Sequence, residues 1–295
     1  MHYAVSLYLV LFIAPATLIV ALEDEPVFRV RTNLGSESTS SRKNAFNAYM
    51  MKASEIDDPK RTVDVLSYVS EAYKVCPLCG IEENLLENTA NGNKIVQTLN
   101  DYDNFPERRW LMERILPAYV KHACKHASNL IRVMWIGVDI YTLRYEHIME
   151  LLGKLFHCQI DFVQIEYVAD KAMSYSSFST SPILSYDVSD LDAITKEPLL
   201  ASETFDLIFA FGVIIGKIAG NVPRVLQSYN YLLKSGGLVL VHEENPAYEA
   251  AIAKMSASDP PFKFSVHDTY EYTSDTSFQE RVLFLKKNAS LAPTE

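Results

Sequence analysis

Two residues with useful chemistry follow two apolar runs of this chain. Gly137 comes directly after the run Ile131–Ile136, and Glu166 directly follows the run Ile160–Ile165. A glycine lets a ligand approach the backbone of a turn closely, and a carboxylate at the end of the next strand accepts hydrogen bonds from ribose hydroxyls. The pair predicts that a nucleotide-like ligand binds across the carboxyl ends of neighbouring parallel strands.

The stretch between these residues has the period of a helix. Strand, turn, amphipathic helix and strand, in that order, predict the first half of a nucleotide-binding α/β sheet. The turn is a weak glycine-rich motif, because Asp139 and Tyr141 stand where further glycines are expected; an ordinary turn after a buried strand fits it equally well. The apolar face recurs at i, i+3, i+4 and i+7 and consists of Ile148, Leu151, Leu152 and Leu155.

Strand and helix patterns continue to the end of the chain. A helix is expected from Asn221 to the Ser235-Gly236-Gly237 stop, since asparagine caps and glycine ends helices. Two apolar tail segments, 262–266 and 281–285, predict strands that close the sheet antiparallel at its edge. Buried strands are expected at 183–186, 205–212 and 238–241.

The sequence of the amino end indicates a targeting segment followed by a linker. Residues 3–22 carry no charge and precede Glu23-Asp24-Glu25, which favours a secretory signal peptide with Ala21 near the cleavage site. The basic n-region is missing, so a retained membrane anchor or a buried helix is the alternative. We expect residues 1–22 to be the signal or anchor, 23–54 a flexible linker, 55–104 a helical cap and 105–295 the main domain.

The composition and net charge of the chain limit the kinds of partner that it can bind. The 295 residues are 48% hydrophobic and 22% charged, enough to bury a full core, and the formal net charge is −10. No Lys/Arg cluster offers a local site for phosphates, so no nucleic-acid partner is expected. A membrane partner is expected only if residues 1–22 are retained as an anchor.

Four cysteines permit up to two bridges outside the cytosol. Cys76 and Cys79 form a C-x-x-C, which is typical of a local disulfide or two ordinary thiols, but also of a redox pair. A zinc site would need further ligands, which the segment His122–His126 offers only if the fold brings it close. No metal site is predicted.

From Pro106 to Lys287 the order of these elements resembles the class I S-adenosylmethionine-dependent methyltransferases. The resemblance rests on the acid Asp187 after the third strand, the block Phe205–Ile208, and the run Leu232–Leu238. That run resembles the Leu-Lys-Pro-Gly-Gly turn before the fifth strand of the family. The resemblance implies a Rossmann-like doubly wound α/β sheet of about seven strands with an antiparallel terminal strand, preceded by a helical extension.

The resemblance also implies S-adenosylmethionine as cofactor. Gly137 would lie under its methionine part, Glu166 would hold the ribose hydroxyls, and Asp187 with the Val188 backbone would meet the adenine amino group. Asp139 could accept a hydrogen bond from the cofactor's amino group, or block the site.

After the fourth strand, the resemblance implies that Phe209, Ala210, Phe211 and Gly212 line the cofactor and face the acceptor.

Methyl transfer from a sulfonium requires an aligned acceptor and a base. His242 and Asn245 follow the fifth strand at the edge where substrates bind, so His242 is the candidate base and Asn245 positions the acceptor. Both could equally be polar edge groups that face solvent.

Three functions fit the sequence. The leading hypothesis is a methyltransferase acting on a small molecule or a protein side chain. The alternative is a secreted or lumenal protein that keeps the fold as a binding or interaction module without catalysis. A nicotinamide-dependent oxidoreductase fits less well, because the third glycine is absent.

Overall fold

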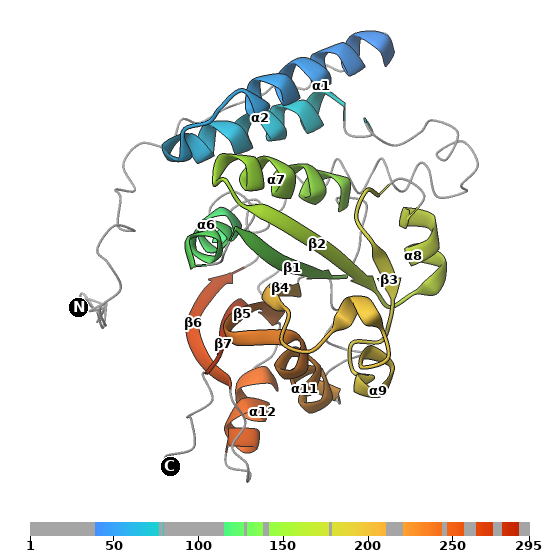
Figure 1. Ribbon diagram of the computed structural model, residues 1–295, viewed down its shortest axis with the longest axis vertical. Coiled ribbons are helices and arrows are strands. Elements are labelled where there is room, and N and C mark those ends of the chain that lie inside the picture. The colour runs from blue at the N-terminus through green and yellow to red at the C-terminus, as the bar shows by residue number, and fades with distance from the viewer. Residues whose placement is uncertain are drawn as a thin grey trace, which may run out of the picture. The chain divides into compact units, whose positions relative to one another are not determined.

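The apolar runs of the sequence form one seven-stranded sheet in the computed structural model (Figure 1). The structure describes residues 39–76, 79, 115–126, 129–137, 142–176, 179–210, 221–243, 247–256, 264–273 and 279–288. The strands are β1 (Leu130–Ile136), β2 (Gln159–Glu166), β3 (Ile183–Ser185), β4 (Phe205–Ala210), β5 (Leu233–Glu243), β6 (Phe264–Thr273) and β7 (Gln279–Lys287).

The strand order is β3-β2-β1-β4-β5-β7-β6. Strands β1 to β5 are mutually parallel, and β7 is antiparallel to both neighbours, β5 and β6. The sheet of about seven strands with an antiparallel terminal strand is therefore confirmed. One detail of the tail is corrected: β6 and β7 do not both run against the sheet. Because they pair as a hairpin with β7 on the inside, β6 regains the direction of β5 at the edge.

Helices cover both faces of the sheet. On one face, α7 (Thr142–Leu155) and α6 (Leu116–His126) pack over Val133 and Trp135. On the other face, α9 (Leu191–Ile194) and α11 (Val222–Leu232) pack over Met134 and Val163, with α12 (Ala247–Ser256) beside α11. The short helix α8 (Ala169–Ser176) contacts β2 and β3. The predicted apolar face of α7 is buried throughout: Ile148, Leu151, Leu152 and Leu155.

The helix α1 (Thr39–Ser54) corrects the linker predicted over residues 23–54. Its buried side chains Phe46 and Ala53, and the partly buried Tyr49 and Met50, recur at i, i+3, i+4 and i+7 and belong to the main hydrophobic cluster. Phe46 packs edge-on against Tyr73 of the next helix, with 5.3 Å between ring centroids. The polar residues between these positions mask the period, which is why the segment resembles a linker. Residues 1–38 lie outside the described part of the chain.

The second helix of the extension begins with an acidic cap and a proline. Asp58 accepts a hydrogen bond from the amide of Lys60, and Pro59 opens a 3-10 turn, Pro59–Arg61, that leads into α2 (Thr62–Val75). Figure 1 shows α1 and α2 as a layer over α7, and the three share one hydrophobic cluster with β1. Residues 80–104 of the predicted cap lie outside the described residues. Among the residues described, no helix is both long and apolar enough to cross a bilayer.

Charged side chains fasten the amino ends of the central strands, opposite the predicted ligand edge. Asp206, part of the quoted Phe205–Ile208 block, accepts hydrogen bonds from the Arg132 amide and from Lys234 Nζ, each at 2.8 Å. Lys287 is 3% exposed, and its Nζ donates to Glu203 Oε1 and to the carbonyls of Asn230 and Leu233. These acids and cations stabilise the sheet and take no part in a site at the other edge.

Candidate functional site

Three of the predicted ligand-binding residues lie at the ends of adjacent strands. Ile136 is in register with Ile165, and Glu166 is in register with Ser185. The Gly137 amide donates to the Ile165 carbonyl at 2.9 Å, and the Tyr186 amide donates to the Glu166 carbonyl at 3.1 Å. Since paired strands lie about 4.8 Å apart, Gly137, Glu166 and Asp187 share one edge of the sheet.

Gly137 bends the chain where it leaves β1. Its φ is 87°, a left-handed value that favours glycine. The indole nitrogen of Trp135 donates to the Gly137 carbonyl at 3.1 Å. Trp135 is itself buried, with its ring 4.2 Å from that of Tyr145 on α7. The first peptide of the turn is therefore held in place by the core below it, although the turn carries only one of the expected glycines.

Glu166 is a buried carboxylate at the end of β2, with 6% of its surface exposed. Its Oε1 accepts a hydrogen bond from the Val168 amide at 3.0 Å, which fixes the side chain. Its Oε2 accepts none from the part of the chain that the structure describes. Because a buried carboxylate is costly unless it is hydrogen-bonded, Oε2 is suited to accept hydroxyl protons from a ligand.

Asp187 follows β3 in a tight turn. Its Oδ1 accepts from both the amide and the hydroxyl of Ser189, at 2.8 and 2.7 Å, while Oδ2 has no partner among the described residues. The side chain of Val188 is buried at 5% exposure in the core. The turn thus fixes an exposed acid whose outer oxygen can accept from an amino group.

Phe209 is a core residue, which corrects the prediction that it lines the cofactor. It is completely buried, and its ring lies 5.7 Å from that of Trp135 on the α7 face of the sheet. Parallel strands are buried on both faces, so an apolar strand residue gives no sign of which neighbour it meets. Phe209 packs in the core beneath the carboxyl ends of the strands.

The remaining predicted residues are only partly described. His242 belongs to β5, where it is in register with Val282 of β7. Since β4 lies between β1 and β5, the end of β5 is about 10 Å from Gly137 along the edge. Asp139, Phe211 and Asn245 lie outside the residues that the structure describes.

Glu146 is an important residue that the sequence did not indicate. It is 7% exposed on α7 and accepts hydrogen bonds from Gln164 Nε2 at 2.8 Å and from the Ser179 hydroxyl. It also accepts from the amide and hydroxyl of Thr180, each at 3.1 Å, and from the Ser181 amide. It thereby fixes the segment that enters β3 and positions Asp187. An acid near the apolar face of α7, followed by a serine-rich segment, is the signal that could have identified it.

A hollow of about 510 Å³ lies beside this network, at the opposite end of β2 from Glu166. It is lined by α7, by Gln159–Phe162 of β2 and by Thr180–Pro182. It is separate from the strand tips, so it does not serve the ligand predicted there.

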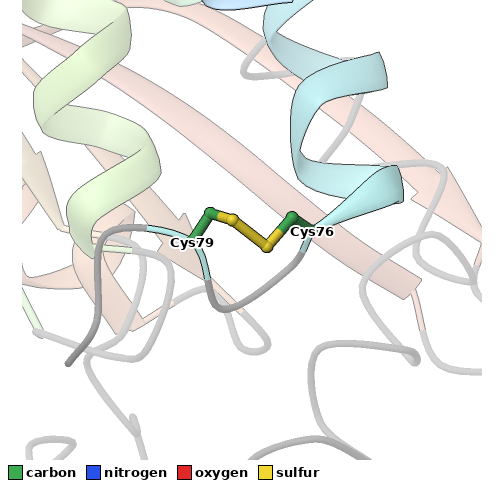
Figure 2. The surroundings of a disulfide bond; sticks show 2 residues. All are labelled: Cys76 and Cys79. Carbon is green, nitrogen blue, oxygen red and sulfur yellow. A yellow bond between two sulfur atoms is a disulfide. The ribbon is translucent and has the colours of Figure 1, made fainter. Parts of the chain in front are cut away.

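The C-x-x-C forms a disulfide. Cys76, directly after α2, is bonded to Cys79 (Figure 2). This confirms the local bridge among the alternatives for the motif. His122 and His126 contact each other along α6, with 4.5 Å between ring centroids, and no three metal-ligating side chains gather within the described ranges.

The strand order and the inserted antiparallel β7 define the class I methyltransferase fold. No family model and no curated protein sequence matches the chain. Its fold is similar to that of TrmN from Thermus thermophilus, at 17% identity and a TM-score of 0.39 over 58% of this chain. The match spans about half, 48%, of the TrmN chain.

Two further solved structures are similar at the same level. A predicted O-methyltransferase from Agrobacterium tumefaciens is 16% identical, with a TM-score of 0.40 over 59% of this chain and 82% of its own. A variant of a 16S rRNA (adenine(1408)-N(1))-methyltransferase from Catenulisporales acidiphilia is 10% identical, with a TM-score of 0.38 over 60% and 93%. These likenesses concern the general fold, and no residue role is taken from them.

Proposed function

We propose that this chain is an S-adenosylmethionine-dependent methyltransferase whose acceptor is a small molecule or a protein side chain. The observation that carries the proposal is the shared edge of Gly137, Glu166 and Asp187. In each of these two carboxylates, one oxygen accepts hydrogen bonds from the protein and the other has no partner among the described residues. This pair of acceptors suits an adenosyl group, whose ribose hydroxyls and adenine amine are all donors.

The chain's residues then act by binding and alignment. When bound, the cofactor supplies a methyl group on a positively charged sulfur, so the protein need only align the acceptor and take up its proton. Glu166 orients the ribose, Asp187 the adenine, and the left-handed Gly137 lets the ligand approach the backbone. We assign Asp139 and Phe211 to the cofactor side, and His242 and Asn245 to the acceptor side, as base and positioning group.

The net charge of the protein bears on which class of molecule is the methyl acceptor. With a net charge of −10, the protein repels a polyanion at long range, which favours an acceptor other than nucleic acid. One structural neighbour is named as an rRNA methyltransferase. Direct nucleic-acid binding is therefore tested below.

A second candidate is a binding module that holds the ligand without turnover. The single glycine of the first turn favours it, because Asp139 and Tyr141 bring side chains where the family has none. In that case the adenosyl ligand still binds, and no methyl group is transferred.

We also infer that the chain enters the secretory pathway. The uncharged residues 3–22 and the bridge between Cys76 and Cys79 support this, since disulfides persist in oxidising compartments. Amino-terminal sequencing of the mature protein from eukaryotic cells tests it: a start just after Ala21 is expected, and an intact Met1 would indicate a retained anchor or another route.

Calorimetric titration with S-adenosylmethionine and S-adenosylhomocysteine tests the function. Binding is expected for the native protein and for Asp192→Ala, an exposed acid on α9, and is expected to weaken in Asp187→Ala. Folded native protein that binds neither compound would overturn the proposal. Binding without transfer to any amine, hydroxyl or carboxyl acceptor in a radiolabelled-methyl assay would favour the module.

A further inference from the structure

The first half of β2 has a neighbouring strand on one side only, within the described part of the chain. β3 pairs with Gln164–Glu166, whereas β2 begins five residues earlier, at Gln159 (Figure 1). On its other side, β2 pairs with β1 from Gln159 to Ile165. The stretch Gln159–Val163 therefore presents one unpaired edge.

The backbone hydrogen bonds show which groups face this edge. In a parallel ladder, successive residues direct their N–H and C=O groups to alternate sides of the strand. The Gln164 amide donates to the Pro182 carbonyl on the β3 side, whereas the Ile165 carbonyl accepts a hydrogen bond on the β1 side. Two and four residues before Gln164, Phe162 and Ile160 therefore direct both backbone groups away from β1. We call these groups of Ile160 and Phe162 the open edge.

Pro182 keeps β3 from closing the open edge. The next ladder bond toward the start of β3 would run from the residue 182 amide to the Phe162 carbonyl, but proline has no N–H. The residues before it, Ser179–Ser181, are hydrogen-bonded to Glu146 on α7. The chain thus enters β3 from α7, and no strand in the described ranges pairs with Ile160 or Phe162.

The hollow of about 510 Å³ lies along this edge, because Gln159–Phe162 line it together with Met149 and Gly153 of α7. Its volume is within the range of about 300–1,000 Å³ that is typical of ligand pockets. At about 3.3 Å per residue, the stretch accommodates about four residues of an extended chain. Phe162 is 6% exposed, and buried peptide groups are costly unless they are hydrogen-bonded. The edge is therefore suited to a ligand that itself carries peptide groups.

The charges in the lining favour a basic ligand. Glu150 is exposed on α7, and no cation pairs with it within the described ranges. Lys154, in the same lining, donates its Nζ to the Ser54 carbonyl, and Asp161 is paired with Arg132 at 2.6 Å. The carboxylate of Glu150 therefore suits a lysine or arginine side chain of a bound segment.

We propose that an extended peptide carrying a lysine or arginine docks in this hollow as an added strand beside Gln159–Phe162. Its backbone pairs with the open edge, which is recognition by strand addition, and its basic side chain pairs with Glu150. The site lies at the opposite end of β2 from Glu166, so the proposal does not depend on methyl transfer.

Hydrogen exchange of the full chain, resolved by residue, tests whether the edge is open. The amides of Ile160 and Phe162 are expected to exchange at least about tenfold faster than those of Asp161 and Val163, which pair with β1. Equal protection of all four would show that another part of the chain covers the edge, and would overturn the proposal.

A random hexapeptide display library, selected on the full chain, supplies the ligand. The enriched peptides are expected to contain lysine or arginine, and their synthetic forms should protect the Ile160 and Phe162 amides from exchange. N-methylation of every second peptide bond removes either the donors that face β2 or those that face outward. One methylated form should therefore bind at least about tenfold more weakly in calorimetry, and the other should bind as the parent does. Equal affinities of the two forms, or no enriched peptide, would overturn the proposal.

A charge reversal tests the role of Glu150. Glu150→Lys is expected to weaken peptide binding by about tenfold, because it replaces an attraction by a repulsion. Asp192→Lys, which reverses an exposed acid on α9, is the matched control and should bind as the native protein does. Equal affinities of the two variants would overturn the assignment of a basic peptide.

Discussion

Glu166 lies at the carboxyl end of β2, where its Oε2 can accept a hydrogen bond from a ligand. Replacing it with glutamine keeps the size of the side chain and removes the charge, and hydrogen bonds to charged groups contribute about 1.5–3 kcal/mol. We therefore expect Glu166→Gln to weaken binding of S-adenosylhomocysteine by about 10- to 100-fold in calorimetry. Asp192→Asn is the control and should bind as the native protein does. Unchanged affinity in Glu166→Gln would remove this residue from the site.

Gly137 and Gly236 have nearly the same backbone conformation. Substituting each of them therefore separates the effect of backbone strain from the effect of blocking a ligand's approach. Gly137 has a φ of 87° and Gly236 a φ of 81°, and nothing lies within 4 Å of a side chain built on Gly236. We expect Gly137→Ala and Gly236→Ala each to lower the free energy of unfolding by about 1–2 kcal/mol, measured by urea denaturation. Only Gly137→Ala should also weaken cofactor binding. Equal affinities in the two variants would show that the Gly137 turn does not touch the ligand.

At the scale of elements, α7 connects the helical extension to the sheet and fixes the entry to β3. Glu146→Ala would leave the donors of Ser179, Thr180, Ser181 and Gln164 without their acceptor. Because buried donors without partners are costly, we expect a loss of about 2–4 kcal/mol in the free energy of unfolding. Glu150→Ala, an exposed acid on the same helix, is the control and should change stability little. A loss of the same small size in Glu146→Ala would mean that the segment before β3 is held by other contacts.

The contact between α2 and α7 should depend on pH. The Tyr73 hydroxyl and His147 Nδ1 are hydrogen-bonded at 2.7 Å, with Arg144 over the Tyr73 ring. Burial lowers the pKa of His147 below its ordinary 6.5, and the carboxylates of Glu150 and Glu146 oppose that shift. Below pH 6.5 the unfolded chain therefore binds a proton that the folded chain does not, until the folded pKa is passed.

The stability of the protein should consequently fall as the pH drops through this window. The measurement is the urea midpoint at about pH 7.5 and about pH 5, compared between native protein and His147→Phe. The variant should lose part of the difference between the two conditions. His157→Asn is the control, since His157 is exposed and asparagine tolerates its φ of 52°. An unchanged pH dependence in His147→Phe would assign the effect to other groups.

At the scale of the whole molecule, the negative net charge predicts that the protein does not bind nucleic acid. A chain with a net charge of −10 and no Lys/Arg cluster in its sequence should not retard single- or double-stranded RNA in a gel at physiological salt. Retardation that weakens steeply with added salt would instead identify a local phosphate-binding surface and reopen nucleic acid as the acceptor.

The sequence predicted the parts of this fold that have local signatures. The period of α7 and the strand ends at Gly137, Glu166 and Asp187 are visible within short windows. The Glu146 network is not, because its donors come from a segment far along the chain. The burial of Phe209 was equally hidden, since an apolar residue in a parallel strand can face a ligand or a helix. The helix α1 was missed because polar residues dilute its apolar stripe.

β7 follows β6 in the chain but has an interior place in the sheet. β7 separates β5 from β6, and Lys287 near its end fastens the junction of α11 and β5. A nascent chain that has not yet released these residues from the ribosome leaves the edge of β5 open and β6 without a neighbour. The sheet therefore closes only after β7 has left the ribosome, and a premature stop codon before β7 would yield a product exposed to quality control and degradation.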